Sequence, residues 1–171
     1  RSNDKITIEY GPEFVYMLRG QAEVGVGGQT VRLEQGKALA FPAGIRRTYR
    51  GDGRILSFIL GTRAAVWGNA ESLKAGCSER LTGFRDGRQL ARLVRVAFSP
   101  GAQTPVHTHP GPEVVYAPET PIILQTEGRL RWVMGGDLAT VHGDNALQAR
   151  NIGAGEAWFL ALFVVPEGAA F

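Results

Sequence analysis

The 171-residue sequence predicts an all-β protein made of two copies of one β domain. The chain has 23 glycines, and short runs rich in Val, Ile, Phe, Tyr and Trp lie between glycines and prolines, which is typical of all-β proteins. The segment "GPEFVY" at residues 11–16 returns as "GPEVVY" at residues 111–116, which indicates an internal repeat. Paired glycines at 27–28 and 135–136 separate segments in which apolar and polar residues alternate, which indicates turns between strands.

The repeat has a constant spacing of 100 residues and needs no gap. Further identities at this spacing are Gly28 with Gly128, Gly36 with Gly136, Arg50 with Arg150, Gly53 with Gly153, and Leu60 with Leu160. Chance aligns single glycines, but it does not align a hexapeptide in register with them. We therefore expect residues 1–62 to form the first domain and residues 81–171 to form the second.

The strands expected in each copy follow from its apolar runs. They cover residues 5–10, 13–26, 29–42 and 54–61 in the first copy, and 90–99, 112–117, 121–134 and 156–166 in the second. The second copy has about twenty residues of strand and turn before its histidines, whereas the first has six before the matching point. The first strands of copy one are therefore absent, upstream, or supplied by another chain.

Between the copies, residues 63–80 form a predicted linker whose composition shifts to Ala, Asn, Glu and Lys. Asn69 is a candidate N-cap and Gly76 a candidate terminator, so one short helix is expected there.

Composition and charge exclude several functions. The net charge of +3 is modest, and the densest basic segment, residues 45–54, lacks the broad stripe that nucleic-acid binding needs. Cys77 is the only cysteine, which excludes an internal disulfide and a cysteine-based zinc cluster. The longest apolar run, residues 157–166, is about half of the ~20 residues that a membrane helix requires. We expect a soluble protein, cytoplasmic rather than secreted, although a start at Arg1 instead of Met leaves the compartment open.

Two of the three histidines, His107 and His109, stand two residues apart, and Glu113 follows four residues later. In a strand, residues i and i+2 face the same side, so both rings are expected to point to one place. The segment 110–112, "PGP", breaks that strand, and Glu113 can return to the same point from the next one. Two imidazoles and one carboxylate suit divalent Fe, Mn, Ni or Zn and leave coordination positions open. The other interpretation is a pair of histidines with unrelated partners.

This segment resembles the first motif of the cupin superfamily, G-x5-H-x-H-x3-E-x6-G, at Gly101, His107, His109 and Glu113. The second motif, G-x5-P-x-G-x2-H-x3-N, aligns with both copies, and each copy departs from it at some positions. Its positions are Gly36, Pro42, Gly44, Arg47 and Gly51 in copy one, and Gly136, His142, Asp144, Leu147 and Asn151 in copy two. In each copy 15 residues separate the end of the first motif from the start of the second.

The resemblance implies two jelly-roll (double-stranded β-helix) barrels in tandem, a bicupin arrangement, with a degenerate first copy. In that copy Thr7, Glu9 and Arg47 stand where the family has histidines, and only Glu13 remains. We predict a hydrogen bond from Arg47 to Glu13 or Glu9 in place of a metal.

The second copy keeps three family ligands, His107, His109 and Glu113, and has Leu147 in place of the fourth. His142 and Asn145 are the nearest candidates for additional contacts to the site.

Two functions stay open. The first is a metal-dependent enzyme of the dioxygenase, isomerase or lyase type, acting on a small organic molecule in the second barrel. The second is a non-catalytic cupin that binds or senses a small molecule. No nucleophile with an adjacent base is evident, so no catalytic side chain is assigned. Expected partners are a small-molecule ligand and, as an open choice, a second copy in a homodimer.

Overall fold

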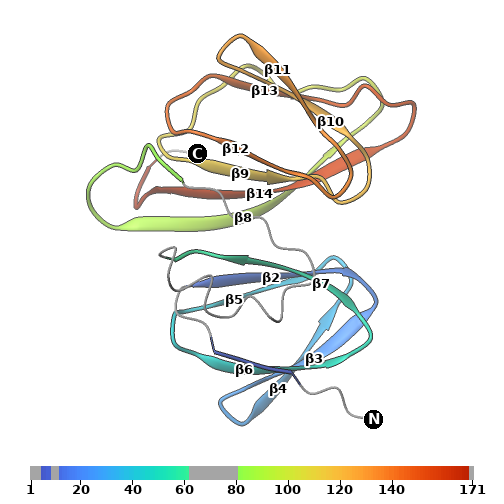
Figure 1. Cartoon of the computed structure of the whole chain (residues 1–171), viewed down its shortest axis with the longest axis vertical. Coiled ribbons are helices and arrows are strands. Elements are labelled where there is room, and N and C mark those ends of the chain that lie inside the picture. The colour runs from blue at the N-terminus through green and yellow to red at the C-terminus, as the bar shows by residue number, and fades with distance from the viewer. Residues whose placement is uncertain (1–4, 9–11, 62–80, 170–171) are drawn as a thin grey trace. The chain divides into compact units, whose positions relative to one another are not determined.

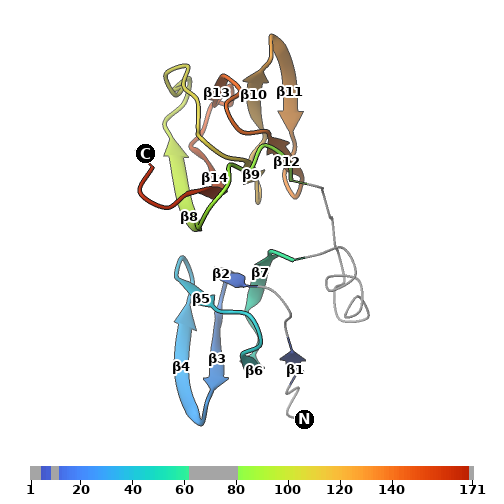
Figure 2. The same cartoon turned by 90° about the vertical axis from the view of Figure 1, so that its left-hand side faces the viewer.

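The computed structural model describes residues 5–8, 12–61 and 81–169, and every regular element in these ranges is a β-strand. The chain divides into two compact units, residues 1–76 and 77–171. Both views show strands β1 to β7 and strands β8 to β14 gathered into separate groups (Figure 1, Figure 2). The all-β prediction is confirmed. Within the described ranges no helix is long and apolar enough to cross a membrane.

The predicted domain boundaries at 62 and 81 enclose a segment, residues 62–80, that lies outside the described residues. The boundaries and the short helix between Asn69 and Gly76 therefore stay predictions.

The first unit consists of two antiparallel sheets. One has the order β1 (Lys5–Ile8), β6 (Arg46–Gly51), β3 (Gln21–Val26), β4 (Gln29–Glu34), and the other β5 (Ala38–Phe41), β2 (Glu13–Arg19), β7 (Arg54–Ile59). Alternate residues of these strands point inward, because successive side chains of a strand face opposite sides. The buried cluster contains Val15, Met17, Ala22, Val24, Leu33 and Phe41.

The second unit repeats this design, again with two sheets. Its sheets have the orders β11 (Arg129–Val133), β10 (Ile122–Thr126), β13 (Leu147–Arg150), and β12 (Leu138–Val141), β9 (Glu113–Tyr116), β14 (Ala157–Pro166), β8 (Gln89–Phe98). Strand β14 is buried along nearly its whole length, and Phe98, Val115, Leu124 and Phe159 belong to the core that it helps to form.

Backbone pairing supports the 100-residue spacing for most of the repeat. Val26 pairs with Arg47, and Thr126 pairs with Leu147 in the same way. The hairpin turns also match: Gly27 and Gly28 have φ of +55° and +80°, and Glu127 and Gly128 have φ of +50° and +71°. Two consecutive left-handed residues match the twist of the flanking strands, which explains why glycine recurs at these turns.

The last strand departs from the gapless repeat. Leu60 N donates to Pro12 O at 3.0 Å, and the equivalent bond in the second unit is made by Val164 N to Pro112 O at 3.0 Å. Leu60 therefore corresponds to Val164, and its expected equivalence with Leu160 is wrong. The extra residues lie between β13, which ends at Arg150, and β14, which begins at Ala157.

In the second unit β8 covers one edge of β14 over ten residue pairs. No strand of the first unit pairs with the corresponding edge of β7 within the described ranges.

Candidate metal centre

The segment that carries the histidines is extended but forms no regular strand. It pairs with β13 at two isolated β-bridges, Gln103 with Arg150 and His107 with Leu147. The predicted strand through both histidines is therefore wrong, because the prolines on either side of them lack the N–H that a continuous ladder needs. The two rings still lie together, with 4.8 Å between their centroids at an interplanar angle of 82°.

Glu113 is the first residue of β9, and only 3% of it is exposed. Its Oε2 lies 3.7 Å from His109 Nε2 and has no hydrogen-bond partner in the part of the chain that the structure describes. Burial raises the pKa of the Glu113 carboxyl to about 8. Burial, followed by the proximity of His107, lowers the pKa of His109. Both groups are therefore more easily kept neutral than in water.

His107, His109 and Glu113 line one cavity of about 340 Å³. Its apolar side chains include Val94, Val96, Leu124, Leu147, Phe159 and Phe163. The three predicted ligands therefore face one space, and Leu147, in the family's fourth position, presents an apolar side chain to it. The Phe163 ring lies against His109, with 4.6 Å between the ring centroids.

The side chains of His107, His109 and Glu113 are not arranged around a single point. Among the described residues, no group of three His, Cys, Asp or Glu side chains is placed so that it could hold a metal ion. His107 Nδ1 lies 2.7 Å from Pro105 O. Because a carbonyl only accepts, Nδ1 must donate, which leaves the lone pair on Nε2 as the metal-binding atom of the neutral ring.

The chemistry of the donor set nevertheless fits a transition metal. Two ligand atoms at about 2.0–2.2 Å from one ion can lie up to about 4.4 Å apart, so the 3.7 Å between His109 Nε2 and Glu113 Oε2 is compatible with a shared ion. A buried carboxylate oxygen without a hydrogen bond is a group that a cation would satisfy.

His142 and Asn145 do not line this cavity. His142 Nδ1 lies 2.8 Å from Thr82 Oγ1, and Asn145 Nδ2 donates to Glu127 Oε1 at 2.5 Å. The expectation that they contact the site is therefore not met. Asp144 N donates to the His109 carbonyl at 2.8 Å, so this turn supports the histidine segment through its backbone.

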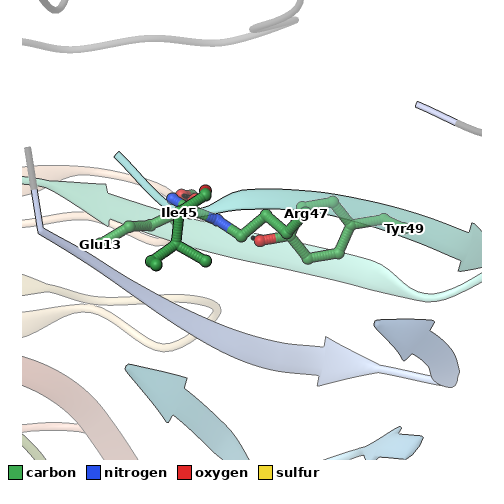
Figure 3. Close-up of polar contacts among 5 residues, drawn as sticks. Glu13, Ile45, Arg47 and Tyr49 are labelled. Carbon is green, nitrogen blue, oxygen red and sulfur yellow. Dashed lines mark hydrogen bonds and ion pairs between the residues drawn. The ribbon is translucent and has the colours of Figure 1, made fainter. Parts of the chain in front are cut away.

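In the first unit, Arg47 stands at the register position that Leu147 has in the second unit (Figure 3). Arg47 is fully buried, and its Nε donates to Glu13 Oε2 at 2.5 Å. Its Nη2 forms an ion pair with the same oxygen, and its Nη1 donates to Ile45 O at 2.7 Å. The guanidinium carbon lies 4.8 Å from the centroid of the Phe41 ring. The predicted bond from Arg47 to Glu13 is confirmed.

Two further groups that the sequence analysis missed also contact Glu13. Tyr49 OH donates to Oε2 at 3.4 Å, and Ser57 Oγ donates to Oε1. Burial, and then the charge of Glu13, raise the pKa of Tyr49. Glu9 lies outside the described residues, and Thr7 pairs with Arg47 through the backbone.

A family model described as a cupin domain matches residues 9–59. No curated protein sequence matches the chain. Among solved structures, the S161A mutant of Bacillus subtilis oxalate decarboxylase OxdC aligns with 96% of this chain and 66% of its own, at 17% identity and a TM-score of 0.69. Another structure of that enzyme, described by its Mn(II) centres, has 16% identity and a TM-score of 0.68 over 96% of this chain and 66% of its own.

Two other structures match. The formate complex of Lactobacillus farciminis oxalate decarboxylase has 15% identity and a TM-score of 0.69 over 95% of this chain and 73% of its own. A Cupin 2 conserved barrel domain protein from Leptotrichia buccalis has 15% identity and a TM-score of 0.55 over 96% of this chain and 79% of its own. At these identities the matches establish the fold alone.

Proposed function

We propose that this chain, which belongs to the cupin superfamily and carries two cupin barrels in tandem, binds a divalent transition metal in its second barrel. His107, His109 and Glu113 are the proposed ligands, and the proposed activity is that of a metal-dependent enzyme on a small organic molecule. One observation carries the proposal: two imidazoles and a buried carboxylate with an unpaired oxygen line the same cavity.

The protein's own groups have separable roles in this proposal. His107 is held in one tautomer by the Pro105 carbonyl, and His109 is held against Phe163. Glu113 supplies the negative charge that offsets part of the charge of a dication. A metal bound there supplies a Lewis acid that polarises an oxygen atom of the substrate. Leu147 leaves the fourth family position without a donor, so substrate or water can occupy it.

Dioxygenase, isomerase and lyase chemistry are all compatible with such a site. The names of two structural neighbours, both oxalate decarboxylases, support testing lyase chemistry first. The Mn(II) centres named for one of them support manganese as the first metal to test, ahead of Fe, Ni and Zn.

The alternative function is non-catalytic binding or sensing of a small molecule. Two observations favour it: the first barrel holds a guanidinium beside its carboxylate, and the second barrel has lost one family ligand to Leu147. A protein that binds metal and ligand without turnover fits this alternative.

Metal binding is tested by titrating chelator-treated protein with Mn(II), Fe(II), Ni(II) and Zn(II) and measuring metal content after dialysis. We expect about one ion per chain and its loss in a His107→Ala/His109→Ala variant. His142→Ala is the matched control, because that histidine lies outside the cavity, and it should keep the ion.

Release of CO2 from small carboxylic acids, and oxygen uptake with candidate diols and phenols, then separate the enzyme from the binding protein. Stoichiometric metal in the double variant, or none in the parent at saturating concentrations, contradicts the proposal.

A further inference from the structure

Three stretches of the second unit pack backbone against backbone beside the candidate metal centre. They are residues 82–85, which precede β8, the segment that contains Gly111, and the turn 142–145, which follows β12. A Cβ atom added at Gly83 would lie 2.8 Å from Gly143 N, and one added at Gly143 would lie 2.7 Å from Gly83 O and 3.0 Å from Gly111 Cα. Glycine is therefore required for this close approach.

The segment from the end of β12 to the start of β13 contacts the backbone of all three proposed ligands. These contacts are the pairing of Val141 with Glu113, the hydrogen bond from Asp144 N to His109 O at 2.8 Å, and two hydrogen bonds between Leu147 and His107. The contacts of Glu113 and His107 are made by residues of strands, whereas Asp144 lies in the turn between them. A movement of this turn therefore displaces His109 relative to the other two ligands.

Residues 82–85 hold the turn with two side chains. Thr82 Oγ1 lies 2.8 Å from His142 Nδ1, and Arg85 Nη2 donates to Asp144 Oδ1 at 2.7 Å. An exposed ion pair contributes little to stability by itself. Here it acts together with a second hydrogen bond and with the glycine contact, so four consecutive residues fix the turn at three points.

Asp144 adopts a backbone conformation that favours glycine. Its φ is +63°, and the first unit has Gly44 at the corresponding register position, with φ of +76°. The left-handed conformation is unfavourable for residues with a Cβ atom, although aspartate tolerates it better than most. Glycine would suffice for the turn, but only a residue such as aspartate provides the carboxylate that Arg85 binds.

We infer that residues 82–85 form a strap that holds His109 in place, with Arg85 as a positioning residue, and that this strap controls how fast a bound cation leaves the site. Arg85 acts through Asp144, whose N–H holds the His109 carbonyl. When the turn opens, His109 is free to leave the ion first, and dissociation becomes faster. This inference rests on the proposed function, since it assigns the regulation of the same site.

Two pairs of variants separate the strap from general effects on stability. Arg85→Gln is compared with Arg88→Gln, because Arg88 is also an exposed arginine before β8 but pairs with Glu167, at 3.2 Å. Gly83→Ala is compared with Gly87→Ala. Both glycines have positive φ, of +82° and +100°, but a Cβ atom at Gly87 meets nothing within 4 Å. Backbone strain is therefore present in both alanine variants, and contact with the turn in only one.

The first measurement is amide hydrogen exchange of metal-free protein by NMR. The protection factor of the Asp144 amide should fall about threefold or more in Arg85→Gln and about tenfold or more in Gly83→Ala. The two control variants should match the parent, and Arg85→Lys should restore most of the protection. Asp144→Gly relieves the backbone at this position, so a merely structural aspartate predicts equal or greater protection there, whereas the strap predicts less.

The second measurement is the rate at which Mn(II)-loaded protein releases its ion to an excess of chelator. Every variant should still bind one ion at saturation, because the three ligands remain. Arg85→Gln and Gly83→Ala should release it at least about threefold faster than the parent and the two controls do. Release at the parent's rate from both strap variants overturns the control of dissociation, and unchanged protection of Asp144 in both overturns the strap itself.

The two measurements separate this inference from the proposed function. If the protection of Asp144 depends on Arg85 and Gly83 in a protein that takes up no metal, the proposed function fails and the strap stands as a support of His109 alone. If the parent binds metal and both strap variants match it in protection and in release, only this inference fails.

Discussion

Glu13 and Glu113 occupy equivalent positions in the two barrels, and each is 3% exposed. Around Glu13 lie Arg47, Tyr49 and Ser57, all of which contact the carboxylate. The strand registers place Leu147, Ala149 and Ala161 at the corresponding positions around Glu113. One barrel therefore surrounds its carboxylate with donors, and the other has hydrocarbon at these three positions and a cavity that Glu113 shares with His107 and His109.

This difference shows two ways to bury the same charge. A buried carboxylate is costly unless a cation or hydrogen bonds accompany it. In the first barrel the cation belongs to the chain, so it is present under all conditions. In the second barrel the described residues supply no such resident cation beside Glu113, and burial raises the pKa of that carboxyl to about 8. A site that lacks a resident cation can accept an exchangeable one.

The largest effect is expected from removing the resident cation. Arg47→Leu leaves Glu13 buried and without its main partner, and should lower the free energy of unfolding of the first barrel by about 3–5 kcal/mol. Calorimetry together with hydrogen exchange of residues 12–61 measures this barrel separately.

Two further variants control for this result. Arg46→Leu changes the exposed neighbour on the same strand and should have little effect. Glu13→Leu/Arg47→Leu removes both charges and should recover most of the lost stability, because a buried ion pair can be replaced by hydrocarbon at little cost. An Arg47→Leu protein that melts with the parent would show that the ion pair does not hold this barrel together.

A second prediction concerns the stability of the second barrel in metal-free protein as a function of pH. The folded-state pKa of Glu113, about 8, lies above its unfolded value of 4.5, so the fold favours the protonated form. Its contribution to stability is complete below pH 4.5, decreases as pH rises, and is lost above pH 8. Over this range we expect a loss of roughly 5 kcal/mol.

Glu113→Gln isolates this effect, because it keeps the size of the side chain and removes its titration. The lowered pKa of His109 acts in the opposite direction, reducing stability at acidic pH, and is retained in this variant. Denaturation between pH 6.5 and 9 should therefore be flatter for Glu113→Gln than for the parent. Parallel curves for the two proteins would contradict a neutral buried Glu113.

A smaller effect is expected from restoring the family's fourth ligand. Leu147→His places an imidazole opposite His107 in the register, facing the cavity, and should tighten metal binding at least about tenfold. Leu147→Ala, which opens the same space without adding a donor, is the control and should bring no gain. Isothermal titration with Mn(II) distinguishes the two, and equal affinities for both variants would argue against three existing ligands at this point.

The repeat and strand alternation were sufficient to predict an all-β tandem, and the resemblance to the cupin motifs was sufficient to predict the two barrels and a bond from Arg47 to Glu13 or Glu9. The tyrosine could have been predicted too, since Tyr49 follows Arg47 by two residues and shares its face. Ser57 could not, because a gapless repeat compares it with Ala157. The structure places its true equivalent, Ala161, four residues further along the chain.

The failures at His142 and Asn145 have a common cause. Motif spacing identifies which residues lie near a site but does not tell which way a turn directs its side chains. His142 is hydrogen-bonded to Thr82, which is 60 residues away in the chain, and Asn145 is hydrogen-bonded to Glu127.

The smallest effect is expected at the serine of the first barrel. Ser57→Ala removes one donor to Glu13 but leaves Arg47 in place, so stability should fall by only about 1–2 kcal/mol. The reciprocal change, Ala161→Ser, adds a hydroxyl at the equivalent position beside Glu113. A donor favours the ionised carboxylate and lowers the folded-state pKa of Glu113, so the loss of stability should begin at the same pH as in the parent, end at a lower pH, and be smaller in total. If Ser57→Ala costs as much as Arg47→Leu, the hydroxyl supports Glu13 as strongly as the guanidinium does, and the contrast between the two barrels would then not depend on a resident cation alone.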